Sequence, residues 1–262
     1  MSVIVIVGPT GCGKTGVSIE IAKEVEENRL SGFLDVEIIS ADSRAIYKGM
    51  DIGTAKPTRE EQKEVRHWGI DLVYPGERFT VADWKQYAEK KIEEILARGN
   101  LPIVVGGTGL YVDALVYDYK FRGIGLNKKV IRDESGEYPD RKAMKPTYKV
   151  FGIRTEMNVL RERLKERANK LFVQELFDET RMLVEKYGWD NQAMKSNIYQ
   201  FAWGYLNGDY TLEEAIKLNV FDDYHLAKRQ MTWFKRNKEI VWVSLENIKQ
   251  SVLKCIQDEQ GK

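Results

Sequence analysis

Short apolar runs alternate with amphipathic stretches through the first 115 residues of the chain. The runs are rich in β-branched residues, as is typical of strands buried in a parallel sheet, and they cover residues 3–7, 36–40 and 101–105. The stretches between them show the spacing of helices that bury one face, and they cover residues 15–28, 59–65 and 81–98. This alternation predicts an α/β fold with a parallel sheet and crossover helices.

The pattern changes beyond residue 115. Residues 116–149 show little periodicity, so we expect a long, partly mobile connection there. Helical spacing returns over residues 155–186, with buried positions at Leu160, Leu164, Leu171 and Leu176, and continues over residues 212–218 and 222–236. Residues 240–243 predict a last strand, and residues 245–257 a short helix. The predicted division is a core (residues 1–115), a connection (116–149) and a helical region with a strand that completes the core (150–262).

The first strand leads into a complete phosphate-binding loop of the form G-x-x-x-x-G-K-[ST]. Backbone N–H groups of such a loop point inward around a phosphate, and the helix that follows adds partial positive charge. Lys14 supplies a mobile charge, and Thr15 supplies a hydroxyl that can bind Mg²⁺. The motif predicts a P-loop NTPase-like parallel sheet with flanking helices and a helical C-terminal region. The residues expected to bind a di- or triphosphate are Gly8, Pro9, Thr10, Gly11, Cys12, Gly13, Lys14 and Thr15.

Three strand ends are expected to meet at one edge of the sheet, because ligands bind at the carboxyl ends of parallel strands. These ends are residues 8–15, residues 42–44 and residues 106–108. Asp42 and Thr108 therefore join the phosphate-binding loop as candidate site residues.

Composition narrows the partners of the chain. Its formal net charge is +1, so a nucleic-acid surface must be a local patch and not a property of the whole chain. Cys12 and Cys255 are the two cysteines, which we expect to be reduced. No apolar stretch reaches the roughly 18 residues of a membrane span, and the chain opens directly on a strand, without a signal peptide. We therefore expect a cytoplasmic protein that does not bind membranes. We also expect it to be a monomer.

Several segments resemble the tRNA dimethylallyltransferases, which transfer an isopentenyl-type group to the adenine immediately 3′ of the anticodon. The most specific is residues 42–57, which read DSRAIYKGMDIGTAKP. Residues 102–111 (PIVVGGTGLY) and 227–235 (AKRQMTWFK) match two further family patterns. Shorter likenesses occur at residues 8–15, 67–71 and 81–83. The resemblance implies dimethylallyl diphosphate as donor, the anticodon stem-loop of tRNA as partner, and Mg²⁺ as cofactor.

Alkylation of an exocyclic amine by this donor needs a diphosphate cradle, a metal and a carboxylate near the amine. Lys14 and Mg²⁺ on Thr15 would stabilise the departing diphosphate. Asp42 would accept a hydrogen bond from the adenine amine and act as general base, and Thr108 would donate to a diphosphate oxygen. Two plainer roles stay open, because Asp42 can form a turn and Thr108 can cap a helix.

Two arginines and a basic segment complete the predicted site. Arg163 and Arg167, four residues apart, share a helix face in a segment similar to a family segment that approaches the diphosphate. The alternative is a solvated charged face. Trp233 and Phe234 are more typical of a core than of base stacking. The residues expected to contact tRNA are Asp42, Ser43, Arg44, Ala45, Lys228, Arg229, Gln230 and Lys235. For Ser43 and Arg44 an exposed turn is an open alternative.

The chain departs from the family pattern in length. Family members usually carry a helical insertion that grips the anticodon stem-loop, and residues 116–149 are too few to form it. The sequence therefore predicts a compact form with an intact diphosphate site and an altered RNA-binding half. Two other functions stay open, namely prenyl transfer to a free adenine nucleotide and a small-molecule kinase that uses ATP on the same loop. A non-enzymatic RNA-binding protein is a third.

Overall fold

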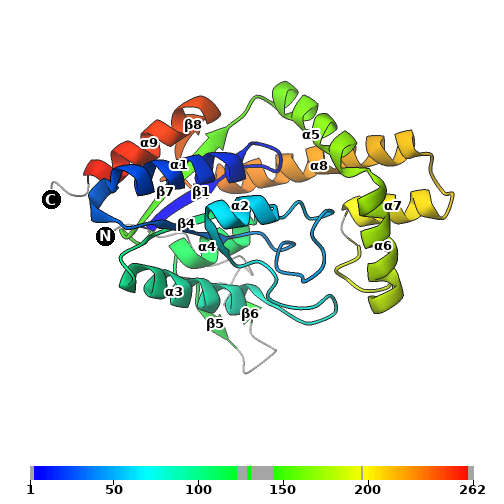
Figure 1. Ribbon diagram of the computed structural model, residues 1–262, viewed down its shortest axis with the longest axis horizontal. Coiled ribbons are helices and arrows are strands. Elements are labelled where there is room, and N and C mark those ends of the chain that lie inside the picture. The colour runs from blue at the N-terminus through cyan, green and yellow to red at the C-terminus, as the bar shows by residue number, and fades with distance from the viewer. Residues whose placement is uncertain (1–2, 123–128, 131–143, 196, 259–262) are drawn as a thin grey trace.

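The computed structural model describes residues 3–122, 129–130, 144–195 and 197–258 of the chain (Figure 1). Most of the connection predicted at residues 116–149 lies outside these residues. Two short antiparallel strands flank part of it, β5 (Phe121–Arg122) and β6 (Lys129–Val130). None of the helices in the described ranges has the length and apolar character needed to cross a membrane.

A six-stranded sheet forms the centre of the molecule, with the strand order β3-β2-β4-β1-β7-β8. All five neighbouring pairs are parallel, which confirms the predicted α/β fold. The bounds are β1 (Val3–Val7), β2 (Val36–Ser40), β3 (Arg66–Trp68), β4 (Leu101–Gly106), β7 (Tyr148–Arg154) and β8 (Val241–Ser244). The sheet places the ends of β2, β4 and β1 next to one another.

Helices cover both faces of the sheet because alternate residues of each strand point to opposite sides. Ile4 and Ile6 of β1 pack in a core with α1 (Lys14–Asn28) and α9 (Leu245–Asp258). Val5 and its neighbours Val3 and Val7 pack in a second core with α3 (Val81–Ala97) and α4 (Gly109–Val116). Figure 1 shows these two pairs of helices on opposite sides of the strands. The short helices α2 (Arg59–Glu64) and η1 (Leu30–Gly32) lie in the connections.

The remaining helices form an extension at one end of the molecule (Figure 1). They are α5 (Met157–Leu171), α6 (Gln174–Tyr187), α7 (Asn197–Leu206) and α8 (Leu212–Phe234). A third apolar cluster joins this extension to the segment after β2, because Met50 is fully buried among residues such as Leu176 and Tyr199. The extension therefore lies against the segment that carries the family-like pattern at residues 42–57.

Several predicted elements differ from the structure. Strand β7 was not expected, because its residues span the end of the predicted connection and the start of the predicted helical region, yet it lies between β1 and β8. Gly152 weakens the strand pattern of this segment, because glycine is unfavourable in strands. In the structure Trp242 packs so closely against Gly152 that a Cβ atom would not fit there. The helix predicted over residues 155–186 is two helices, α5 and α6, and the two pieces predicted within residues 212–236 are the single helix α8. Strand β3 and helix α7 were not predicted.

Candidate functional site

The phosphate-binding loop joins β1 to α1 as the motif predicts. Gly11 and Gly13 have φ values of 75° and 95°, in the left-handed region that other residues resist. Packing also excludes a larger residue at position 11, since a Cβ atom on Gly11 would lie 2.8 Å from Leu164 of α5. Helix α1 has no side-chain cap at Gly13, so its first N–H groups stay available to an anion. Cys12 is fully buried, and no disulfide involves it.

Lys14 lies folded back on this loop. Its Nζ donates to the carbonyl oxygens of Gly8 and Pro9, at 3.0 and 2.7 Å. The ammonium is therefore partnered by neutral backbone groups, which a phosphate would replace with a stronger, charged partner. Thr15 follows in the first turn of α1 and is half-buried.

Helix α5 brings an arginine to the same loop. Arg167 donates from one guanidinium nitrogen to the Thr10 hydroxyl at 2.7 Å. Arg163 and Arg167 are both half-buried, whereas Glu162 and Glu166 are exposed. The two arginines thus share the side of α5 that turns toward the protein, and the solvated-face interpretation does not describe Arg167.

The ends of β2 and β4 are joined through Thr108. Its N–H donates to the carbonyl oxygen of Ala41 at 3.1 Å, and its Oγ1 accepts from the Ser43 N–H at 3.0 Å. Thr108 stands at the N-cap position of α4, but its side chain makes no cap hydrogen bond. The predicted meeting of the strand ends is therefore present, and the hydroxyl of Thr108 faces the Ser43 turn.

Asp42 uses one carboxylate oxygen to form its own turn. Its Oδ1 accepts from the N–H groups of Arg44 and Ala45, at 2.8 and 3.4 Å. Within the described part of the chain no hydrogen bond engages Oδ2. The turn-forming interpretation therefore accounts for one oxygen and leaves the other available to an acceptor amine.

An aromatic pair lies in the same core as Ala41, the residue before Asp42. Tyr111 stacks on Trp84 with ring centroids 4.6 Å apart. Burial raises the pKa of the Tyr111 hydroxyl well above its usual range, and the nearby Tyr47 and Asp42 raise it further. Tyr111 therefore keeps its hydroxyl proton at neutral pH.

Gln230 of α8 ties two of the site loops together. Its Oε1 accepts from the Thr10 N–H at 2.8 Å, and its Nε2 donates to the Gly107 carbonyl oxygen at 3.0 Å. One turn later, Trp233 donates to Asp113 at 2.8 Å. The amide of Gln230 thus serves the backbone of the protein, and an RNA contact by Gln230 stays a prediction.

The segment of residues 42–57 is held by two polar groups that sequence reasoning missed. Lys56, with a side chain only 2 % exposed, donates to Asp51 and Asp71 at 2.7 and 2.6 Å. Glu179 of α6 accepts from three successive N–H groups, those of residues 51–53, at 2.9 to 3.1 Å, and from the Tyr199 hydroxyl at 2.6 Å. Lys56 lies within the recognised pattern, but no signal in the sequence marks Glu179.

The predicted RNA contacts differ in exposure. Ala45 is buried, and Ser43 and Arg44 are half-buried. Phe234 is 1 % exposed, which confirms its expected place in the core, and Trp233 packs against the same core. The basic residues at the end of α8 are all exposed, namely Lys228, Arg229, Lys235 and Arg236.

Among the described residues, no group of three or more His, Cys, Asp and Glu side chains could hold a metal ion. Burial lowers the pKa of His67, and its Nδ1 lies 2.7 Å from the Val65 carbonyl oxygen, as expected of a structural histidine. Thr15 thus remains the candidate ligand. One hydroxyl suits Mg²⁺ because this ion keeps several waters and takes other ligands from a bound phosphate.

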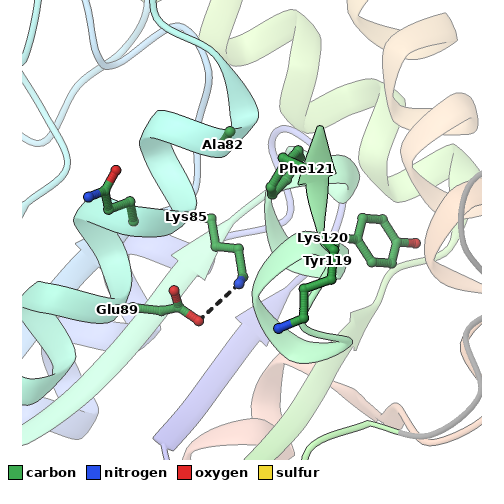
Figure 2. Close-up of a pocket in the computed structure, with 7 residues that line it drawn as sticks. Ala82, Lys85, Glu89, Tyr119, Lys120 and Phe121 are labelled. Carbon is green, nitrogen blue, oxygen red and sulfur yellow. Dashed lines mark ion pairs between the residues drawn. The ribbon is translucent and has the colours of Figure 1, made fainter. Parts of the chain in front are cut away.

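A pocket of about 270 Å³ lies between α3 and the segment after α4 (Figure 2). Lys85, on its wall, pairs with Glu89 at 3.2 Å and with Asp118 at 2.6 Å. Burial raises the pKa of Asp118, but hydrogen bonds from Lys120, Lys85 and Lys145 outweigh this effect and hold that pKa well below its usual range. These lysines and carboxylates pair with one another, and none of the predicted site residues lines the pocket.

Comparison with known proteins gives one consistent result. The family model described as IPP transferase matches residues 45–142 and 125–237. The tRNA dimethylallyltransferase of Pelotomaculum thermopropionicum is 34% identical over 308 aligned positions, which cover 96% of this chain and 95% of the relative. That of Acetivibrio thermocellus is 36% identical, with 93% and 91% covered. Both alignments are longer than this chain, as expected if the relatives contain residues that it lacks.

Solved structures agree with this result. The tRNA isopentenylpyrophosphate transferase of Bacillus halodurans has a TM-score of 0.80 and 29% identity, and 99% of this chain and 98% of that chain are covered. A eukaryotic dimethylallyltransferase acting on tRNA has a TM-score of 0.75 over 96% of this chain and 77% of that one. Because the eukaryotic enzyme is only 20% identical to this chain, its similarity supports the fold and nothing further.

Proposed function

The chain belongs to the IPP transferase family, and we propose that it transfers a dimethylallyl group from dimethylallyl diphosphate to N6 of the adenine 3′-adjacent to the anticodon of tRNA. One observation carries the proposal within this structure. A phosphate-binding loop at the end of β1 and a carboxylate at the end of β2 lie on either side of the end of β4, where Thr108 bonds to the Ser43 turn and Gln230 joins Gly107 to Thr10 of the loop. Adjacent strands lie about 4.8 Å apart, so the outer two of these ends are separated by roughly 10 Å. That distance suits a diphosphate at one end and an adenine at the other.

The diphosphate side is formed by the loop. Its N–H groups, Lys14 and Arg167 supply the positive charge that a leaving diphosphate needs. Arg163 lies on the same side of α5 and is the second arginine of this set. The Thr108 hydroxyl donates to the Ser43 Oγ at 3.3 Å in this structure, and we assign it to donate to a diphosphate oxygen when the donor is bound. Bound Mg²⁺, with Thr15 as its protein ligand, would neutralise further charge on the diphosphate.

The acceptor side is formed by Asp42. As N6 of the adenine bonds to C1 of the prenyl group, the bond from C1 to the diphosphate oxygen breaks. The proton leaves N6 for the Oδ2 of Asp42, which is free to accept it, while Oδ1 keeps the turn in place. The products are the alkylated adenine and diphosphate.

The remaining assignments belong to the same proposal. Lys228, Arg229 and Lys235 are exposed cations on or beside α8 that suit contacts to RNA phosphates. A tRNA substrate and two cysteines without a disulfide suit the cytoplasm. We also propose that the protein acts as a monomer.

Two acceptors distinguish this function from prenyl transfer to a free nucleotide. Purified protein is incubated with labelled dimethylallyl diphosphate and either unfractionated tRNA or AMP, and Lys14→Ala serves as the control. We expect label in tRNA and none in AMP, with one diphosphate released per group transferred. Labelling of AMP alone would contradict the proposed acceptor. In a parallel incubation with ATP, transfer of its γ-phosphate to a small molecule would identify a kinase.

A further inference from the structure

We infer that Lys48, Tyr74 and Lys186 form a contact surface for the single-stranded RNA that flanks the target adenine, an inference that rests on the proposed function. The Nζ of Lys48 lies 4.5 Å from the centroid of the Tyr74 ring. The Nζ of Lys186 lies 5.7 Å from the same centroid and 5.2 Å from that of Tyr187. Tyr74 is 46% exposed, so the ring is open to a partner.

Backbone contacts hold this surface in place. The N–H of Lys48 donates to the Val73 carbonyl oxygen at 2.8 Å, and Tyr47 forms an isolated parallel bridge with Val73. Tyr74 begins a turn in which its N–H donates to Glu77 at 2.7 Å. The same turn abuts the connection after α6, where a Cβ atom at Gly76 would lie 3.0 Å from Asn191. Three segments distant in sequence thus meet at Tyr74.

Within the described residues, the ammonium groups of Lys48 and Lys186 have no carboxylate partner. Asp51 and Asp71 are engaged by the buried Lys56, and Glu77 accepts from the backbone of Tyr74. Glu185 is exposed beside Lys186 on α6, but neither Lys48 nor Lys186 forms an ion pair within the described residues. Two ammonium groups gathered over an exposed aromatic ring are typical of sites that take a phosphate and stack a base.

The surface adjoins the acceptor side of the site. The Asp42 carboxylate accepts from the N–H of Ala45, and the next residue, Ile46, accepts at 3.1 Å from the N–H of Val73, which directly precedes Tyr74. Lys48 follows Tyr47 directly. An RNA strand whose adenine reaches Asp42 therefore has its neighbouring nucleotides within reach of Lys48 and Tyr74. Unpaired loop nucleotides suit such a surface because their bases can stack on aromatic rings.

Binding of unfractionated tRNA as a function of salt concentration tests the inference without relying on transfer activity. Lys48→Ala and Lys186→Ala should each weaken binding severalfold and flatten the plot of log affinity against log salt by about 0.7, the value for one single-strand phosphate contact. Tyr74→Ala should weaken binding about fivefold or more with an unchanged slope, whereas Tyr74→Phe should bind like wild type. The matched control is Lys217→Ala, which removes an exposed lysine that pairs with Glu213 at 2.7 Å on α8.

The outcomes separate this inference from the proposed function. Wild-type slope and affinity in both Lys48→Ala and Lys186→Ala would overturn the surface, even if the enzyme modifies tRNA. An equal loss in Lys217→Ala would also overturn it, because the effect would then be general to surface charge. If instead the wild type transfers no prenyl group to tRNA, the proposed function fails, whatever the binding data show.

Discussion

Substitution of Asp42 separates two roles that the structure assigns to one carboxylate. Asp42→Asn keeps an Oδ1 that can accept from the Arg44 and Ala45 N–H groups, so the turn should persist. The amide nitrogen that replaces Oδ2 cannot take a proton from adenine. We expect turnover to fall by about 10²- to 10⁴-fold, the usual contribution of a general base, which corresponds to roughly 3–5 kcal/mol in the barrier.

Asp42→Ala is the matched variant because it removes both roles. It loses the 2.8 Å bond to Arg44 and the weaker 3.4 Å bond to Ala45, which together should cost about 1 kcal/mol of unfolding free energy. For a chain of this size the unfolding midpoint should fall by roughly 2–4 °C. Asp42→Asn should unfold at the wild-type midpoint, although both variants lose turnover.

The assay combines single-turnover transfer to tRNA, the Kd for dimethylallyl diphosphate, and thermal unfolding. The account expects an unchanged donor Kd in Asp42→Asn, because the carboxylate addresses the amine and not the diphosphate. Turnover within tenfold of wild type would refute the role of Asp42 as base. A collapse of donor affinity would instead identify Asp42 as part of the metal site.

Three further predictions concern other parts of the structure. Lys14→Ala should lower transfer by about 10²- to 10³-fold without changing the circular dichroism spectrum, since Lys14 serves the leaving diphosphate. Gln230→Ala should lower the unfolding free energy by about 1–3 kcal/mol in a denaturant titration, because it leaves Thr10 N–H and Gly107 C=O without partners. Burial raises the pKa of Glu37, but hydrogen bonds from its neighbours outweigh burial and lower that pKa below its ordinary 4.5. The ionised Glu37 therefore contributes its full stability at neutral pH, and this contribution is lost as the pH falls below about 4.5. In Glu37→Gln the unfolding free energy should fall less steeply with acid than in wild type.

Each of these has a clear contrary result. Transfer by Lys14→Ala within tenfold of wild type would remove Lys14 from the site. An unchanged unfolding midpoint in Gln230→Ala would mean that the bridge between the two loops is not maintained in solution. Parallel stability curves for Glu37→Gln and wild type between neutral and acid pH would show that the bonds to Asn100, Trp68 and Arg98 do not persist.

Local signals in the sequence explain why the first half of the fold was predictable. The strands β1, β2 and β4 are apolar runs buried on both faces. A helix was expected from residue 81, and Thr80 forms a capping box with Asp83 at the start of α3, which is a local sequence signal. Once these strands are parallel and neighbouring, the meeting of their carboxyl ends follows from geometry alone.

The errors arise where tertiary packing overrides local preference. Gly152 interrupts the apolar pattern of β7, yet the strand is stabilised by pairing on both edges, with β1 and β8. Two helices were expected at residues 212–218 and 222–236, but α8 is continuous, and Asn219 between them is 2% exposed. Neither environment can be read from neighbouring residues.

The candidate site also has a part that could be predicted from local sequence and a part that could not. The loop that carries Lys14 is a local motif, so its place at the start of α1 was predictable. The bridge from Gln230 to Thr10 spans 220 positions, and the contacts of Glu179 with residues 51–53 span more than 120. Such contacts depend on how α6 and α8 pack against the rest of the fold, and the hydrophobic periodicity of the sequence does not predict that packing.

Mapping the transferred group tests the central claim most directly. The protein is incubated with labelled dimethylallyl diphosphate and a set of tRNAs, and the modified nucleoside is identified by digestion and mass spectrometry. The account predicts a dimethylallyl group on N6 of the adenine 3′ of the anticodon, and no label when that adenine is replaced by a purine without the 6-amino group. Label at another position, or label that persists after this replacement, would contradict it.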